Sequence, residues 1–551
     1  MVDITCKNTN ETKSFPKGLS ICQLHEAFGN PLGDGVIAGI VNNKLRELDY
    51  EVFKSKIIEF VDLKHPLVRR MSSRSAIFVL YKAVRDLFPE ANLRVEHSLP
   101  GGVYCEIDNL PFAISQDMAH ALEVKTRDII KANLLFRRQE LPTEEAIELF
   151  KNHRLHDKIN SLETRHSFFT SVYFLDDEVN YFYGYLLPST GYLSFLEFEF
   201  YGNGFLMKTP FSSHSGMAHN VEPNSKLFKV FRLYKEWLDV LNLRYIGDLN
   251  QRVEQKTDGD VIKITEALQE KNIAKIADEI YKRNDAKMVL ISGPSSSGKT
   301  TFGKRLSVQL QVMGLNPVVI ELDNYFKNRE DTPRDENGDY DFETIDALDT
   351  EFFNEQLVEL LDGKEIQPPS FNFYTGQREF RGNTMRLGKR SILVMEGIHG
   401  NNPKLTARVS DKLKYKIFVS AITPISIDAH NPIPTSDNRL LRRIVRDYRT
   451  RGYSAEDTIN RWNSVRRGEE KNIFPFQESA DTMFNSALIF ELSVLKTFAE
   501  PILRAVPETS PAFNDATTLL KFLSYFQPMS DREIPPTSIL REFLGGSSFV
   551  Y

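Results

Sequence analysis

Hydrophobic and polar positions divide the chain into a front half and a back half with different patterns. In the front half, the alternating run 2–6 predicts a strand, and residues 21–28 predict an amphipathic helix with Ser20 as its N-cap. The apolar run 36–41 predicts a further strand, and the two asparagines after it suit a tight turn. The front half therefore begins with a small α+β unit.

Helical periodicity dominates residues 226–285. Apolar residues recur at helical spacing over 227–237 and again over 261–281. The polar stretch from Asn250 to Asp260 predicts a break between the two parts. We therefore expect a helical connector that ends near residue 285.

The back half alternates short apolar runs with helical segments, which is typical of an α/β fold with a parallel sheet. Strands are predicted at 288–291, 317–322, 391–395 and 415–420. Ligands of such folds bind at the carboxyl ends of the strands. Gly293, Asp323 and Glu396 each follow a strand, so we expect them to converge on one crevice. Further helices are predicted at 495–506 and 516–525, and residues 539–551 are expected to pack back on this half.

Composition adds few constraints. The chain has 551 residues, too many for one domain, with 41 % hydrophobic and 26 % charged residues as in ordinary globular proteins. The net charge of −6 gives no sign of a dedicated nucleic-acid binder. No apolar run approaches the ~20 residues of a membrane span, and the first residues lack a signal peptide pattern, so we expect a cytoplasmic protein. Cys6, Cys22 and Cys105 lack metal-ligand spacing, and we expect free buried thiols.

The residues after the first strand of the back half carry the most specific chemistry. Gly293 and Gly298, the latter followed by Lys299 and Thr300, form the pattern of a phosphate-binding P-loop. The glycines let successive backbone N–H groups point at phosphate oxygens, and the next helix adds its positive end. Lys299 supplies a charge for the β- and γ-phosphates, and Thr300 a hydroxyl for Mg²⁺. The predicted nucleotide-binding residues are Gly293, Pro294, Ser295, Ser296, Ser297, Gly298, Lys299, Thr300 and Thr301.

Two carboxylates at strand ends complete a site for phosphoryl transfer. Asp323 and Glu396 can bind Mg²⁺ directly or through water, together with Thr300. Asp323 is also the best candidate for the base that accepts a proton from an acceptor hydroxyl. The alternatives are a helix cap for Asp323 and an ordinary strand-end carboxylate for Glu396.

Cations for the developing charge come from an arginine-rich segment. Arg439, Arg443 and Arg446 fall on one face of a predicted helix, and apolar residues occupy the other side. Gly452 then permits a hinge. The pattern predicts a mobile lid that closes arginines over phosphates, and a solvated basic helix that binds RNA is the alternative.

The front half resembles the corresponding part of threonyl-tRNA synthetases. The opening strand, the segment from Phe15 to Ser20 and the segment from Ala38 to Leu45 resemble a TGS domain, the ubiquitin-like module of that family. Residues 74–89 resemble the synthetase helix that carries a His-x-x-x-His metal pair of the editing domain. Here Arg74 and Phe78 stand where the two histidines belong, and neither side chain binds zinc at neutral pH. We therefore carry over neither metal binding nor aminoacyl-tRNA hydrolysis, and a scaffold, a substrate sensor and an RNA-contact module stay open.

The back half resembles the uridine kinase/phosphoribulokinase family of P-loop kinases from 287 to about 495. The matching motifs are the P-loop, the segment from Leu322 to Phe326, residues 338–349 and 363–369, Glu396-Gly-Ile and the arginine segment. The resemblance implies ATP and Mg²⁺ as cofactors and Asp323 as base on a primary hydroxyl. It places Lys299, Arg443 and Arg446 among the catalytic residues, Arg451 with ATP, and Thr300, Asp323 and Glu396 around Mg²⁺. The implied substrate-binding residues are Tyr325, Glu343, Phe371, Arg378 and Arg443.

Departures from this family concern the acceptor. Phe371 and Gly376 occupy the positions of a tyrosine and a histidine that read the pyrimidine, and Tyr453 replaces a lid arginine. Loss of such hydrogen bonds relaxes or changes specificity. Kinase chemistry therefore carries over, and pyrimidine identity does not.

The sequence thus predicts a multidomain protein with an α+β front half and an α/β P-loop kinase with a parallel sheet. The segments are a TGS-like unit (1–62), a synthetase-like α+β unit without metal ligands (63–240), a helical connector (241–285), the kinase (286–495) and a tail on the kinase (496–551). We expect ATP- and Mg²⁺-dependent phosphorylation of a small-molecule hydroxyl, a nucleoside 5′-hydroxyl first. A kinase of another sugar or polyol and an RNA-associated ATP-hydrolysing switch are the alternatives. No membrane partner is expected, a nucleic-acid partner has no support, and the oligomeric state is open.

Overall fold

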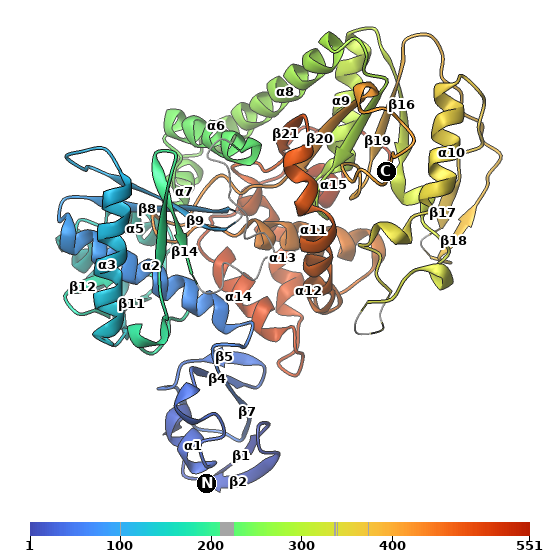
Figure 1. Cartoon of the computed structure of the whole chain (residues 1–551). Helices are drawn as coiled ribbons and strands as arrows, with labels where there is room; N and C mark the ends of the chain where they lie inside the picture. Colours follow the sequence, from blue (N-terminus) through green and yellow to red (C-terminus); the bar gives the residue numbers. More distant parts are fainter. Residues whose placement is uncertain (100, 210–224, 336–337, 339, 373) are drawn as a thin grey trace.

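The computed structural model describes residues 1–551 except 100, 210–224, 336–337, 339 and 373. A small unit at the N-terminus projects from one end of the molecule (Figure 1). The remaining front half and the back half lie side by side above it. His214, a histidine of the front half, lies outside the described residues.

The N-terminal unit is a mixed sheet with one helix. Its five-stranded sheet has the order β2-β1-β7-β4-β5, in which β1 and β7 are parallel. Helix α1 (Ile21–Ala27) begins at a capping box formed by Ser20 and Gln23. Asn42 and Asn43 both have positive φ in the turn between β4 and β5. The strands are β1 (Val2–Cys6), β2 (Glu11–Phe15), β3 (Leu19–Ser20), β4 (Ala38–Val41), β5 (Lys44–Arg46), β6 (Glu51–Val52) and β7 (Lys56–Val61).

Two small sheets and four helices form the rest of the front half. One sheet has the order β13-β14-β9-β8 and the other β10-β11-β12. Phe78 of α2 is fully buried, and Arg74 stacks on Tyr183 with 4.6 Å from guanidinium to ring centre. The elements are α2 (Val68–Leu87), β8 (Asn92–Leu99), β9 (Gly102–Asp108), α3 (Gln116–Lys131), β10 (Arg137–Pro142), α4 (Thr143–Asn152), α5 (His156–Glu163), β11 (Phe169–Leu175), β12 (Glu178–Asn180), β13 (Glu197–Tyr201) and β14 (Gly204–Lys208).

The connector consists of three helices, α6 (Lys226–Leu241), α7 (Ile246–Glu254) and α8 (Asp258–Lys282). The predicted break is present but narrower than expected, because α7 ends at Glu254 and α8 begins at Asp258. Asn250 is a fully buried residue of α7, and its amide donates to the carbonyl of Tyr525 at 2.7 Å and to Thr164 at 3.1 Å. A buried amide with partners is stable inside a helix, which a polar pattern alone does not reveal.

The back half contains a five-stranded sheet of order β16-β19-β15-β20-β21 in which every neighbouring pair is parallel. This confirms the predicted fold class; β16 ends one residue earlier than expected. The strands are β15 (Met288–Ser292), β16 (Asn316–Glu321), β19 (Ser391–Glu396), β20 (Lys414–Ser420) and β21 (Thr482–Asn485). The helices are α9 (Lys299–Val312), α10 (Thr350–Leu361), α11 (Thr435–Arg451), α12 (Ala455–Asn472), α13 (Glu491–Arg504), α14 (Phe513–Leu523) and α15 (Arg541–Leu544), and a hairpin of β17 (Ser370–Asn372) and β18 (Gln377–Glu379) lies beside α10.

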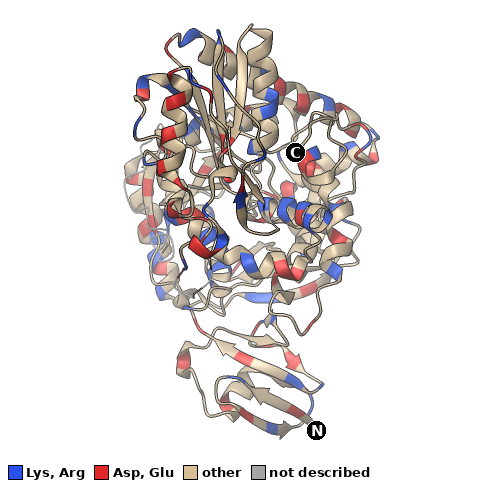
Figure 2. Cartoon of the chain, turned by 90° about the vertical axis from the view of Figure 1, so that its right-hand side faces the viewer, with Lys and Arg blue, Asp and Glu red and all other residues tan. Residues whose placement is uncertain are grey.

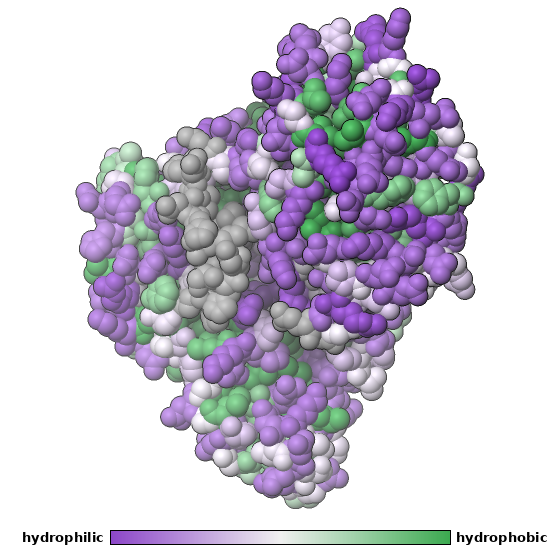
Figure 3. All heavy atoms as spheres, turned by 45° about the vertical axis from the view of Figure 1, so that its right-hand side comes forward, coloured by the Kyte–Doolittle hydropathy of each residue, from purple (hydrophilic) through white to green (hydrophobic). Residues whose placement is uncertain are grey.

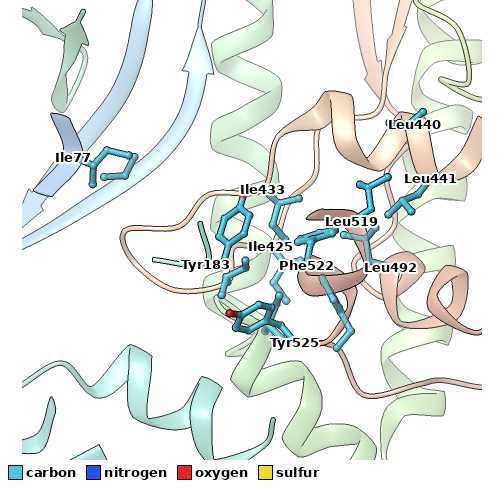
Figure 4. Close-up of a cluster of buried hydrophobic side chains, with 14 of the residues drawn as sticks. Ile77, Tyr183, Ile425, Ile433, Leu440, Leu441, Leu492, Leu519, Phe522 and Tyr525 are labelled. Carbon is cyan, nitrogen blue, oxygen red and sulfur yellow. The ribbon is translucent and has the colours of Figure 1, made fainter. Parts of the chain in front are cut away.

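A continuous apolar core joins the front half to the back half. Figure 4 shows Tyr183 of the front half near Phe522 and Tyr525, which follow or belong to α14. The rings of Tyr183 and Tyr525 are 6.5 Å apart between centres. The same buried cluster continues to Leu440 and Leu441 of α11 and Leu492 of α13. The limits of the five predicted segments stay a prediction.

Polar contacts, one fully buried and one partly exposed, cross the same boundary. Lys158 of α5 donates to Asp428 at 2.9 Å, and both side chains are at most 1 % exposed. Arg70 of α2 forms two hydrogen bonds to Asp437 at 2.7 and 2.9 Å. Asp428 precedes α11 and Asp437 lies in its first turn. The front half therefore contacts that helix directly through Arg70.

Positive and negative residues are interspersed on the side of the molecule seen in Figure 2, and hydrophilic side chains cover most of the face seen in Figure 3. In the described part of the chain, no helix has the length and hydropathy to cross a membrane. All three cysteines are free; Cys6 and Cys105 are buried as expected, and Cys22 is exposed, which corrects the expectation.

The buried Lys158–Asp428 pair gives a test of this shared core. Lys158→Met removes one partner and leaves a buried carboxylate, so we expect the free energy of unfolding to fall by about 3–5 kcal/mol in a urea titration. The control is Lys151→Met, which removes an exposed lysine paired with Glu148 and should change stability by less than about 0.5 kcal/mol. Equal stability of the two variants would contradict a structural role for the pair.

Candidate active site

The P-loop connects the end of β15 to the start of α9. Gly293 has φ +156°, and a Cβ at this position would lie 2.1 Å from the carbonyl oxygen of Val419. Gly298 is the N-cap of α9 in a left-handed conformation with φ +81°. A side chain would therefore clash at the first glycine and strain the second. The first turn of α9, whose N–H groups have no partner within the helix, begins directly after this loop.

Three side chains, two from α11 and one from the residue after β21, hold carbonyls of the loop. Arg439 of α11 donates to the carbonyl of Ser295 at 3.0 Å, and Arg442 to that of Ser296 at 3.3 Å. Ser486 donates to the carbonyl of Ser297. The loop is therefore fixed in place from one side, which is what a preorganised phosphate cradle requires.

The carboxyl edge of the sheet brings the predicted metal ligands together. Glu396 lies opposite Ile291 in the register of β19 and β15 and opposite Glu321 in that of β19 and β16. The hydroxyl of Thr300 donates to a Glu396 oxygen at 2.8 Å. Lys299 donates to the carbonyl of Pro294 at 3.2 Å. Two oxygen ligands of the kind that Mg²⁺ prefers are thus adjacent beside the loop.

Desolvation and like charges raise the pKa values of three acidic groups at this edge. Burial raises the pKa of Glu396 to about 7, with Lys299 opposing and Asp323 adding to the shift. Burial also raises the pKa of Glu343 to about 7, and Glu469 contributes. The pKa of Asp323 is raised by the surrounding protein, whereas Lys299 lowers it. Asp323, Glu343 and Glu396 thus lie close enough to Lys299 to share its field, as expected for one site.

The arginines of α11 divide into two groups. Arg443 donates to the hydroxyl of Ser295 at 3.0 Å, and Arg443, Arg446 and Arg451 each pair with buried Asp447 at 3.2 to 3.4 Å. Arg439 instead is 2 % exposed and forms a bidentate pair with Glu469. The predicted lid is wrong for Arg439, which is a buried support of the loop. Gly452 ends the helix in a left-handed conformation with φ +67°.

Three other predicted substrate residues, like Arg443, are engaged with the protein. Tyr325 is 2 % exposed and donates to Gln356 at 2.8 Å. Arg378 donates to Asp349 at 2.9 Å. Phe371 packs against Phe326 with ring centres 5.7 Å apart. Their roles toward a substrate stay predictions.

Gly376 shows why a histidine does not stand at this position. Its φ is +73°, and a Cβ would lie 2.7 Å from the side-chain Nε of Arg329. The N–H of Arg329 also donates to the carbonyl of Gly376 at 2.8 Å. Gly376, in the turn between β17 and β18, therefore packs against Arg329, and no base-reading side chain stands at this position.

The sequence did not reveal several residues at this edge. Glu469 of α12 accepts from the N–H of Ser295 at 2.9 Å and holds Arg439. His399 is 1 % exposed near Lys299 and Asp346, and burial lowers its pKa to about 4. Its position three residues after Glu396 was the available signal. Thr301, predicted to bind ATP, hydrogen-bonds Glu542 of the tail.

The back half matches a known family. A family model described as Phosphoribulokinase / Uridine kinase family matches residues 288–489. These residues are a phosphoribulokinase/uridine kinase family domain. The uridine kinase of Ligilactobacillus salivarius is 28 % identical over 185 residues, which are 33 % of this chain and 77 % of that protein. Among solved structures, a possible uridine kinase from Bacillus stearothermophilus covers 36 % of this chain and 89 % of that one, with 19 % identity and a TM-score of 0.25.

The front half matches threonine–tRNA ligases. The ligase of Syntrophomonas wolfei is 28 % identical over 194 residues, 35 % of this chain and 30 % of the ligase. That of Geobacter sp. is 30 % identical over 182 residues, 33 % of this chain and 28 % of the ligase. The chain thus spans about a third or less of the length of these ligases. Both resemblances drawn from the sequence are confirmed.

The raised pKa of Glu396 predicts a pH-dependent stability. The folded protein keeps Glu396 protonated up to about pH 7, and the unfolded chain keeps it protonated only up to about pH 4.5. As the pH rises between these values, the unfolded chain gains the free energy of ionising Glu396 and the folded protein does not, so the folded protein becomes less stable. Glu396→Gln should therefore gain stability over the wild type between pH 5 and 8, by up to about 3 kcal/mol. Urea titrations at both pH values measure it, with exposed Glu355→Gln as control. A difference that is independent of pH would rule out the shift.

Proposed function

We propose that the chain is an ATP-dependent kinase that transfers the γ-phosphoryl group to a hydroxyl of a small molecule. The observation that carries the proposal is the convergence of the P-loop, Lys299, Asp323 and Glu396 at one edge of the parallel sheet, within a domain of this family. A phosphoryl-transfer site needs a phosphate cradle, metal-binding oxygens, a base for the acceptor and cations, and these residue types supply them.

Each group has a role that its surroundings support. Asp323 is exposed at the edge, and its raised pKa makes its carboxylate a stronger base for the acceptor hydroxyl. Lys299, Arg443, Arg446 and Arg451 supply positive charge for the phosphates. Thr300, Glu396 and Asp323 would hold Mg²⁺, which would neutralise charge on the phosphate oxygens.

A nucleoside 5′-hydroxyl is the acceptor that we propose first. The family supports it, and Glu343 lies beside Arg443 and Asp323, where a ribose hydroxyl could be bound. The left-handed Gly376 against Arg329 supports a relaxed or changed base preference, so a sugar or another polyol is the second acceptor class.

The substitution Asp323→Asn tests the proposed base. Activity is followed as ADP release from ATP with a panel of nucleosides, sugars and polyols. An active acceptor should raise turnover, and Asp323→Asn should lower its kcat by about 10²–10⁴ with little change in ATP affinity, because a base acts on the acceptor. Asp362→Asn, an exposed change at the end of α10, should leave kcat unchanged.

One outcome would favour a different class of function. If ADP release needs no acceptor and Asp323→Asn leaves it unchanged, the protein is an ATP-hydrolysing switch. The kinase proposal would then fail, because hydrolysis does not need this base.

A further inference from the structure

The tail makes a specific contact with the P-loop. The backbone N–H of Thr301 donates to a carboxylate oxygen of Glu542 at 3.2 Å, and the Thr301 hydroxyl donates to the same oxygen at 2.7 Å. The Thr301 hydroxyl is also 2.8 Å from the hydroxyl of Tyr551. Thr301 is fully buried, so no other group replaces these contacts from solvent.

The contacted N–H belongs to the phosphate cradle. Thr301 is the third residue of α9, whose first N–H groups have no partner within the helix. In a P-loop such N–H groups bind the α- and β-phosphates, and the positive end of the helix attracts an anion. A carboxylate oxygen is an anionic acceptor as a phosphate oxygen is, and one N–H serves only one of them well.

The rest of the tail is anchored and presents Glu542 from a fixed backbone. Ile539, Leu540 and Phe543 are fully buried, and a Cβ on Gly298 would lie 2.6 Å from Ile539. Arg449 of α11 donates to the carbonyls of Glu542 and Phe543 at 3.1 Å each. The short helix α15 therefore stays in place while the Glu542 side chain alone has to turn to release the N–H.

We propose that Glu542 is an internal competitor of the nucleotide: its carboxylate occupies the position of an α-phosphate oxygen on Thr301, and nucleotide binding requires it to leave. This inference rests on the proposed function, because it concerns the same P-loop. Without a nucleotide, the Glu542 carboxylate therefore occupies part of the phosphate-binding site. A partner or ligand that pulls the tail away would raise nucleotide affinity, because the competent state is then already formed.

The residues after α15 also contribute to the contact between the tail and Thr301. Gly545 and Gly546 have positive φ of 92° and 71°, and the residues beyond them carry Tyr551 back to Thr301. Lys304 of α9 lies 5.8 Å from the centre of the Tyr551 ring. Tyr551 therefore supports the Glu542 contact from the far side of the two glycines.

Calorimetric titration of the full chain with ATP tests the proposal. Glu542→Gln keeps the shape and removes the charge, and we expect its apparent Kd for ATP to be about tenfold lower than that of the wild type. The matched control is Glu533→Gln, which removes the same charge from the same tail where Glu533 contacts Lys263 and not the P-loop. Its Kd should equal that of the wild type. Lys299→Ala should abolish binding and so locate the ATP at the P-loop.

The outcomes separate the inference from the proposed function. Binding that depends on Lys299 but is equal or weaker in Glu542→Gln would overturn the competitor and leave the kinase intact. Absence of ATP binding in the wild type and in Glu542→Gln alike would overturn both.

Hydrogen exchange of the wild type gives a second measurement that needs no substitution in the tail. Saturating ATP should speed amide exchange of residues 545–551, because the contact of Tyr551 with Thr301 is lost, whereas the anchored helix α15 should exchange as before. Unchanged exchange of this segment with ATP bound would overturn the competitor.

Discussion

The site depends on two buried ion pairs beneath the P-loop. Arg439 pairs with Glu469 and Arg442 with Glu491, and all four side chains are at most 3 % exposed. Burial of such charges is costly, and each guanidinium offsets part of that cost by also donating to a P-loop carbonyl. The carbonyls of Ser295 and Ser296 are thereby turned to the support, and the N–H of Ser295 also donates to Glu469. Helices α11, α12 and α13 thus determine the conformation of a loop that belongs to none of them.

This support also shapes the electrostatics of the sheet edge. Burial raises the pKa values of Asp323, Glu343 and Glu396, neighbouring carboxylates add to the shift, and Lys299 is the common cation that opposes it. The raised pKa values indicate that the nearby cations of the chain do not fully offset burial and the neighbouring carboxylates. A divalent cation bound by Thr300 and Glu396 would lower those pKa values. The acidic groups are therefore suited to binding a cation that the chain itself does not supply.

The sequence was informative where function depends on local pattern. The P-loop and the carboxylates after β16 and β19 follow from apolar runs and strand ends, because a parallel sheet brings its carboxyl ends to one edge. The sequence did not predict the role of a residue where that role depends on a partner far away in the chain. Arg439 looked like an exposed lid residue until Glu469, thirty residues further on, was seen to pair with it. Asn250 looked like part of the break between two helices, but it lies inside α7, and its partner Tyr525 lies 275 residues away.

The front half is connected to this support through α11. Arg70 of α2 binds Asp437 in the first turn of α11, two residues before Arg439 and five before Arg442. The buried Lys158–Asp428 pair fixes the segment that leads into the same helix. The threonine–tRNA-ligase-like part is therefore a structural neighbour of the P-loop support, because the helix that binds Arg70 through Asp437 also carries the P-loop contacts of Arg439 and Arg442.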